Sequence, residues 1–373
     1  MDHLKGMRDE IDRIDRDILN LLSERKRVVE EVIRKKMELR LPVFVPGREE
    51  QKIAAFRSQA EALGLDPEFA EDFVRLMMSS SRDTQSVSAF PCATEQPKHV
   101  VYVGGDGGMG RLYRSFTERS GHKVDTIDKA TWYRWDELAE TADLVVVTVP
   151  IHATLGVIER LAAKLRPETI LADFTSTKGP SLETMLRMHA GPVLGLHPMH
   201  GPDVPNLTKQ LMVACPAREP EAGEWYLEQC RLWGMQVVDA DPAKHDHVMD
   251  LVQGLRHFVA LLHGSFMKGN DLRPEEMLRY SSPIYRAELM MTGRIFAQSA
   301  ELYADIVFSS TERREMLLNF FRHHEKLSRF VEEDDKEGFV REFEAVTDFF
   351  GKFATQALHE SGYLINRLAD RFS

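Results

Sequence analysis

Two histidines stand in a segment whose composition is typical of a functional loop. His197 and His200 occur in GPVLGLHPMHGPD, residues 191–203, directly after a short apolar run and among prolines and glycines. This pattern predicts a β-strand that ends in a rigid loop, where a fixed scaffold holds side chains in one geometry. A neutral imidazole suits the removal of a hydroxyl proton at pH 7, which the oxidation of a carbinol carbon requires. The alternative is that both rings only cap backbone groups of the loop.

A glycine-rich turn earlier in the chain predicts a dinucleotide site. VGGDGGMGRL places Gly105, Gly107 and Gly110 in a G-x-G-x-x-G pattern between a predicted strand and a predicted helix. Glycine permits a tight turn and lets the backbone approach a pyrophosphate at the N-terminus of the helix. Asp128 ends the next strand, where its carboxylate can accept from both ribose hydroxyls and would repel a 2′-phosphate. We therefore expect NAD rather than NADP, with a solvated strand end as the alternative for Asp128.

A second polar turn is expected beside the same cofactor. Ser176 and Lys178 follow an apolar run in DFTSTKG, and the later strands of an open α/β sheet end at the crevice that holds the ligand. Ser176 is a candidate to hydrogen-bond the substrate hydroxyl or to orient the imidazole, and a local turn cap is the alternative. Lys178 is a candidate to bind substrate, with a solvated loop cation as the alternative.

The surrounding pattern predicts an α/β domain over residues 99–243. Short β-branched runs (HVVYVG, HKVDTID, ADLVVVTVP, TILADFT and PVLGLHP) alternate with helical stretches. Runs that are apolar on both faces suit a parallel sheet covered by helices, so the expected fold is a Rossmann-like doubly wound sheet, which QLMVACP and GMQVVDAD extend. Residues 244–373 are expected to form an all-helical domain that supplies a substrate wall and a dimer interface.

Residues 1–90 are expected to form a separate domain of three helices. Apolar residues alternate at spacings of three and four, which predicts a long first helix with a coiled-coil-like seam. Pro42 and Gly64 end the first and second helices, and the third starts at Pro67. The stretch 86–98 lacks periodicity and is interpreted as a linker. The seam residues are Leu4, Met7, Ile11, Ile14, Ile18, Leu21, Val28 and Val32.

One cation interrupts this seam. The spacing predicts that position 25 faces inward, yet the residue there is Arg25. A buried unpaired cation costs several kcal/mol, so Arg25 should meet an anion. That anion is either a carboxylate of the core or a bound ligand.

Composition limits the possible functions. The 373 residues carry a net charge of −11, which argues against the phosphate backbone of a nucleic acid as the main partner. The chain has no apolar run long enough to span a bilayer, and its charged N-terminus is neither a signal nor a transit peptide. The three cysteines have no CxxC spacing, so we expect free thiols in a reducing cytoplasm and no metal site.

Five motifs together resemble prephenate dehydrogenase: VGGDGGMGRL, STKGPSL, LGLHPMHGP, GLRHF and SSPIYRAELMMTGRIFAQ. The helical N-terminus is similar to an AroQ-type chorismate mutase, and the whole chain resembles the bifunctional T-protein family of tyrosine biosynthesis. The resemblance implies that His197 takes the proton of the 4-hydroxyl of prephenate as the hydride leaves C4 for NAD, before decarboxylation to 4-hydroxyphenylpyruvate. It implies that Arg294 holds a substrate carboxylate, which a planar guanidinium suits.

Two further residues of the helical tail come from the same resemblance. Arg286 lies eight residues before Arg294 and is a second candidate for substrate binding, with a structural ion pair as the alternative. His257 matches a position that the family associates with ligand binding and feedback inhibition by tyrosine. No role is assigned to His200.

The mutase resemblance implies two groups of residues. Arg8, Arg25 and Ser81 match contacts to the two carboxylates of chorismate, and Arg8 reaches the active site of the other subunit, which implies a homodimer. Val45 replaces a family aspartate, and Ile33 stands where glycine is usual.

Lys36 and Gln85 match the donors to the ether oxygen of chorismate, and Arg48 with Glu49 matches the pair near the ring hydroxyl. The rearrangement is pericyclic, so conformational restraint and donors aimed at the ether oxygen suffice.

Two alternatives remain open at this point. A dehydrogenase of the same class could use arogenate, which carries an amino group on its side chain. A catalytically dead NAD-sensing regulator would be expected to lack His197 or Arg294, and the sequence retains both.

Overall fold

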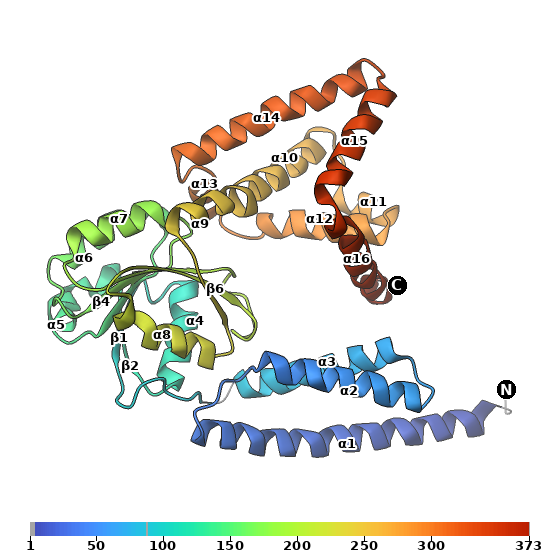
Figure 1. Ribbon diagram of the computed structural model, residues 1–373, viewed down its shortest axis with the longest axis horizontal. Helices are drawn as coiled ribbons and strands as arrows, with labels where there is room; N and C mark the ends of the chain where they lie inside the picture. The colour runs from blue at the N-terminus through green and yellow to red at the C-terminus, as the bar shows by residue number, and fades with distance from the viewer. Residues whose placement is uncertain (1–3, 87–88, 373) are drawn as a thin grey trace. The chain divides into compact units, whose positions relative to one another are not determined.

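The computed structural model describes residues 4–86 and 89–372 (Figure 1). The chain divides into two compact units, residues 1–242 and 243–373. Within the described residues, the first unit contains the N-terminal helices and the α/β domain, and the second is helical. Among residues 4–86 and 89–372, none of the helices combines the length and apolar composition that a membrane crossing requires.

The N-terminal region forms the helices that the apolar spacing predicts. These are α1 (Lys5–Glu38), α2 (Pro46–Ala62) and α3 (Pro67–Ser86). Pro46 and Pro67 occupy first-turn positions, where the missing N–H leaves no unpaired donor. Helices α2 and α3 pack through Ile53, Val74 and Met78. The seam of α1 faces solvent in the isolated chain, and Ile11 and Leu21 are 56% and 65% exposed.

The α/β domain confirms the predicted Rossmann-like sheet. Within the described residues the sheet has seven strands in the order β2-β1-β3-β4-β5-β6-β7. Their bounds are β1 (His99–Val103), β2 (Lys123–Ile127), β3 (Leu144–Val147), β4 (Ile170–Asp173), β5 (Val193–Pro198), β6 (Leu211–Arg218) and β7 (Gln236–Asp239). Strands β1 to β5 are parallel, whereas β6 runs antiparallel to β5 and β7 runs parallel to β6.

The reversal at β6 follows from the connections. A parallel pair needs a crossover, usually a helix, and residues 199–210 between β5 and β6 contain no helix. Strand β7 returns parallel to β6 because α8 (Pro220–Leu232) crosses between them. The loop 199–210 therefore leaves the sheet at the carboxyl end of β5, directly after His197.

Each strand contributes to two cores because successive side chains point to opposite faces. On β1, Val100 and Tyr102 join the core under α4 (Gly108–Arg119) and α8, while Val101 and Val103 join the other. The second face is covered by α5 (Trp135–Ala139), α6 (Ile151–Ala162) and α7 (Gly179–Met188), which follow the 3-10 turn Lys129–Arg134. Phe90, in the predicted linker, is 3% exposed and packs into the first core.

The second unit is helical, as the weak β signal predicts. Arg313 and Asp250 form a buried ion pair, with Nε of Arg313 2.9 Å from Oδ1 of Asp250. The Arg313 guanidinium also donates to the carbonyl of Ile306. The elements are α9 (Pro242–Met249), a π-helical turn Asp250–Leu255, α10 (Arg256–Gly269), α11 (Pro274–Arg279), α12 (Pro283–Phe296), α13 (Ala300–Val307), α14 (Thr311–Glu332), α15 (Lys336–Phe350) and α16 (Lys352–Phe372).

Candidate active sites

The glycine-rich turn joins β1 to α4 in a conformation that requires glycine. Gly104 has φ of 87°, a region that residues with a Cβ rarely adopt. A Cβ on Gly110 would lie 2.5 Å from the carbonyl oxygen of Gly104 and 2.6 Å from the Cα of Gly105. The first turn of α4 therefore lies directly against the loop, and this close approach is what a pyrophosphate at a helix N-terminus needs.

Substituting Gly110 with alanine is expected to weaken NAD binding at least tenfold, because the new Cβ would push the loop away from the start of α4. The measurement is the dissociation constant for NADH from fluorescence titration. Gly156→Ala is the matched control, since Gly156 lies within α6 and a Cβ there meets nothing within 4 Å. Equal affinities for the two variants would contradict the assignment of the loop.

Asp128 lies beside this turn. It follows β2, and its Oδ2 accepts a hydrogen bond of 3.0 Å from the backbone N–H of Asp106. Burial raises the pKa of the Asp128 carboxyl, the N–H of Asp106 opposes the rise, and the charge of Asp106 adds to it. The carboxylate is half-buried against the glycine loop and not a freely solvated strand end. It has further lone pairs with which to accept from ribose hydroxyls.

His197 lies on β5, opposite Val213 of β6, and is 2% exposed. Its neighbour Leu196 accepts a hydrogen bond of 2.8 Å from Nζ of Lys178. The same ammonium lies 2.7 Å from Oδ2 of Asp173, and both charged side chains are fully buried. The end of β4 is thus tied to the peptide that carries His197.

This ion pair changes the interpretation of Lys178. The ammonium is fully buried and donates to Asp173 and Leu196, so it is not a solvated loop cation. The placement favours a positioning role over the direct substrate contact that the sequence predicts. The sequence analysis does not single out Asp173. Its position as the first residue of DFTSTKG, directly after an apolar run, is a signal that could have identified it. Ser176 lies half-buried in the same turn.

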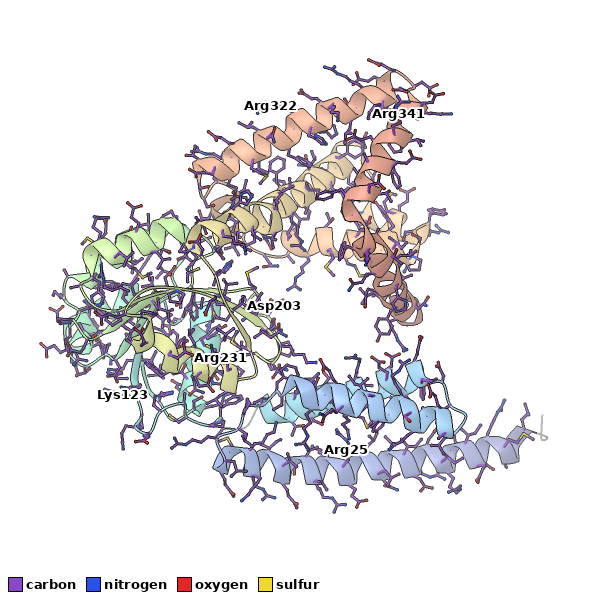
Figure 2. All side chains as sticks on the ribbon, viewed as in Figure 1. Arg25, Lys123, Asp203, Arg231, Arg322 and Arg341 are labelled. Carbon is purple, nitrogen blue, oxygen red and sulfur yellow. The ribbon has the colours of Figure 1, made fainter. Side chains whose placement is uncertain are left out.

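His200 connects the loop after β5 to the nucleotide-binding half of the sheet. Its Nδ1 lies 2.9 Å from the carbonyl of Gly201, so Nδ1 carries the proton and Nε2 accepts from the hydroxyl of Tyr113 at 3.0 Å. Burial lowers the pKa of His200. The sequence assigns no role to this histidine, and the structure places it as a structural tie between the loop and α4. Asp203, labelled in Figure 2, lies further along the same loop.

The second unit holds the other predicted dehydrogenase residues. Arg294 lies exposed on α12, and Arg286, two turns earlier, is half-buried with Nη2 donating to the carbonyl of Leu278 at 2.8 Å. This contact ties Arg286 to the end of α11 through a backbone carbonyl, which is not the ion pair named as the alternative for this residue. His197 and Arg294 belong to different units.

His257 lies on α10 with its ring centroid 4.8 Å from that of Tyr303. Its Nδ1 is buried and has no hydrogen-bond partner among the described residues. Burial, with the neighbouring charges of Arg256 and Arg313, lowers the pKa of His257 to about 4. The imidazole is therefore neutral at physiological pH, and any ligand contact it makes is through a neutral ring.

The N-terminal helices bring several of the predicted mutase residues together. Nη1 of Arg25, labelled on α1 in Figure 2, donates to Oγ of Ser81 at 2.8 Å and to the carbonyl of Met77 at 3.3 Å. Burial lowers the pKa of Arg25. Neither of these partners is an anion, so this half-buried cation retains the capacity to bind an anionic ligand.

Lys36, near the end of α1, points at the loop that follows. Its Nζ donates to the carbonyls of Pro42 and Val43 at 3.0 and 2.9 Å. Burial and the charge of Arg48 lower the pKa of Lys36, and the charge of Glu49 opposes them. The charges of Arg48 and Glu49 thus lie close enough to Lys36 to act on its ammonium.

Arg8 lies near the opposite end of α1 from Lys36. Arg8 is exposed and precedes Lys36 by 28 residues on the same helix, which is about 42 Å at 1.5 Å per residue. One protomer therefore cannot bring both to one small substrate. Ile33 is buried and Val45 is 41% exposed. The side chain of Gln85 lies outside the described residues.

These sites define a class of protein: a dinucleotide-dependent dehydrogenase that is preceded by a helical domain with its own cluster of cationic side chains. Family models match along the chain in the same order. They are chorismate mutase type II at residues 7–86, the prephenate dehydrogenase nucleotide-binding domain at 113–225 and the prephenate dehydrogenase dimerization domain at 241–345.

Full-length relatives specify the family. The chain is 39% identical over 367 residues to a T-protein of Enterobacter agglomerans, covering 98% of both chains, and 37% identical to a T-protein of Haemophilus influenzae. It superimposes on a prephenate dehydrogenase from A. aeolicus in complex with hydroxyphenyl propionate and NAD+, with a TM-score of 0.56, 18% identity and 68% of this chain covered against 97% of that one.

The chain therefore belongs to the T-protein family. It is a bifunctional enzyme with chorismate mutase and NAD-dependent prephenate dehydrogenase domains, which assigns it to tyrosine biosynthesis. The alternative of a catalytically dead regulator is set aside, because both domains and the full-length similarity are those of enzymes.

Proposed function

We propose that the N-terminal helices rearrange chorismate to prephenate, and that the α/β domain with the helical tail then oxidises prephenate to 4-hydroxyphenylpyruvate. The observation that carries this proposal is the placement of His197 at the end of β5, in a sheet whose β1 turn is built for a dinucleotide. NAD, when bound, accepts the hydride from C4 of prephenate.

The dehydrogenase residues take separate roles in this proposal. The backbone of Gly105, Gly107 and Gly110 faces the pyrophosphate, and Asp128 accepts from the ribose hydroxyls. His197 takes the proton of the 4-hydroxyl as the C4–H bond breaks, which leaves a C4 carbonyl. The ring carboxylate is then lost as carbon dioxide, the electron pair of the broken C–C bond makes the ring aromatic, and the C4 oxygen takes a proton back from His197.

Other side chains hold the reacting groups in place. Arg294 forms a bidentate contact with a substrate carboxylate, and Ser176 hydrogen-bonds the substrate hydroxyl or the imidazole. Lys178 acts through Asp173 and Leu196 by fixing the backbone before His197. Arg286 supports the end of α11 and is a weaker candidate for substrate contact.

The mutase site works by restraint and charge, without a base or a nucleophile. Arg25 and Ser81 bind one carboxylate of chorismate as a pair, which their mutual hydrogen bond supports. Lys36 donates to the ether oxygen together with Gln85 once the substrate replaces the loop carbonyls as acceptor. Arg48 and Glu49 face the ring hydroxyl.

A homodimer completes the mutase site in this proposal. Arg8 is too far from Lys36 along α1 to serve the same site, and the apolar seam of α1 needs a partner surface that a second copy supplies. Exposed phenylalanines on α15 (Phe349, 87%) and α16 (Phe353, 58%) support a second dimer contact in the tail. Sedimentation as a species of twice 42.7 kDa would support the dimer, and a monomer would contradict it.

Regulation and location belong to the same proposal. Tyrosine shares the 4-hydroxyphenyl group of the product, and we assign its feedback site to the surroundings of His257. The three cysteines are all free thiols, which suits a cytoplasmic enzyme.

One coupled assay tests the function. Chorismate and NAD supplied together should yield NADH without added prephenate, because the first reaction makes the substrate of the second. Arogenate is the control substrate, since one relative carries the name probable arogenate/prephenate dehydrogenase. A higher kcat/KM for arogenate than for prephenate would overturn the substrate assignment, and absence of NADH from chorismate would overturn the bifunctional one.

A further inference from the structure

Glu49 is held by two cations that come from different parts of the first unit. Its Oε1 lies 2.5 Å from Nη1 of Arg82 on α3, and its Oε2 lies 2.7 Å from Nζ of Lys209. Glu49 is only 16% exposed in its side chain, so these contacts are screened less than those of a surface ion pair. Arg82 belongs to the mutase helices, whereas Lys209 belongs to the β5–β6 loop of the dehydrogenase domain.

Lys209 occupies a backbone conformation that lysine rarely adopts. Its φ is 65°, in the left-handed region where a Cβ lies too close to the following carbonyl oxygen. Its backbone N–H donates to the carbonyl of Gly234 at 2.8 Å, and its ammonium lies 4.8 Å from the ring centroid of Phe44. Glycine or asparagine would fit this backbone better. The feature that favours a lysine at this position is therefore the set of contacts that its ammonium makes.

The segment around Lys209 is fixed on both sides. Nδ2 of Asn206 donates to Asp83 of α3 at 2.7 Å, and Leu207 is fully buried in the sheet core. The mutase loop meets the same region, since the N–H of Val43 donates to the carbonyl of Leu232 at 3.2 Å and Val43 is 6% exposed. The Lys209 ammonium therefore reaches Glu49 from an anchored backbone.

We propose that Lys209 is a positioning residue for chorismate rearrangement: the dehydrogenase domain supplies the cation that holds Glu49 of the mutase site in place. The proposal rests on the proposed function, in which Glu49 faces the ring hydroxyl of chorismate. Oε2 is held by Lys209 and Oε1 by Arg82, so each carboxylate oxygen keeps a lone pair for the substrate in one fixed orientation. Without the ammonium, one of the two restraints is lost.

The test is a double-mutant cycle in the full-length enzyme, with mutase kcat and KM for chorismate as the readout. Lys209→Gln should lower mutase kcat/KM about tenfold, the loss typical of a charge-assisted hydrogen bond. Lys209→Arg should restore most of it. In a Glu49→Gln background, Lys209→Gln should have little further effect, because a residue that acts through Glu49 has nothing left to position.

A second variant separates positioning from folding. Lys209→Gly relieves the left-handed backbone, so its melting temperature should not fall, yet its mutase activity should drop as far as that of Lys209→Gln. Lys164→Gln removes another surface ion pair, with Asp136, and is the matched control. Oxidation of supplied prephenate should stay within about twofold in all Lys209 variants.

Each outcome has a distinct meaning. Additive losses from Lys209→Gln and Glu49→Gln, or full mutase activity in Lys209→Gly, would overturn the positioning role while leaving the proposed function intact. Unchanged mutase activity in Glu49→Gln itself would instead overturn the role assigned to Glu49 in the proposed function.

Discussion

Replacing His197 with asparagine is expected to lower the dehydrogenase kcat by about three orders of magnitude while NAD binding is retained. Asparagine is polar and of similar size, but it cannot accept a proton at pH 7, and a positioned general base contributes about 10²–10⁴ in rate. The glycine loop lies at the end of β1 and keeps its contacts, so the dissociation constant for NADH should change little. Steady-state oxidation of prephenate and NADH titration measure the two effects.

The loop offers a matched control for this substitution. His200→Asn removes the other imidazole, which contacts Tyr113 and Gly201 and has no assigned chemistry. This variant should keep most of the dehydrogenase activity. The loss of the two structural contacts should instead lower its melting temperature. A loss of less than tenfold in His197→Asn, or equal losses in both variants, would refute the assignment of His197 as the base. Mutase activity should survive both changes.

Replacing Lys36 with alanine is expected to lower mutase kcat by about 10²–10³, the range found when one preorganised donor to a developing negative charge is removed. The ammonium is half-buried at the end of α1 and donates to the loop 42–43, where substrate is proposed to replace these acceptors. Oxidation of supplied prephenate should remain largely intact, because His197 and the glycine loop are untouched. Chorismate consumption and NADH formation are measured separately on the same preparation.

Lys35→Ala is the control for this second prediction. Lys35 is the adjacent residue, but it is exposed and pairs with Glu38 on the helix surface, where a single ion pair contributes little. It should leave mutase kcat within about twofold. A similar loss in both variants would show that the helix end, and not the Lys36 ammonium, is what matters.

Local patterns in the sequence predict much of this fold. The doubly apolar strands, the glycine turn and the acid at Asp128 each depend on neighbours within one βαβ unit, so spacing alone identifies them. Helices α1, α2 and α3 follow from apolar periodicity and from prolines at first-turn positions. The direction of β6 depends on the absence of a crossover helix in residues 199–210, which the strand pattern alone does not reveal.

Local sequence patterns do not predict contacts between residues that are distant in the sequence. Lys178 is a candidate for substrate binding from its loop position, yet its hydrogen bond to the carbonyl of Leu196 on β5 forms only when β4 and β5 lie side by side. Lys209 and Glu49 are 160 residues apart, and no local signal links them. The apolar spacing predicts the seam of α1, but the sequence does not identify the surface that covers it.

Val43 limits how this polypeptide can be divided. It comes from the mutase loop but packs among dehydrogenase side chains that include Trp233 and Leu207. A truncation beginning at residue 99 would delete Val43 and leave those aromatic and aliphatic groups facing water, and the severed helices would expose the valine in turn. To obtain either catalytic domain alone, the apolar contacts around Val43 would have to be replaced by polar side chains, because the two domains share a hydrophobic core at this junction.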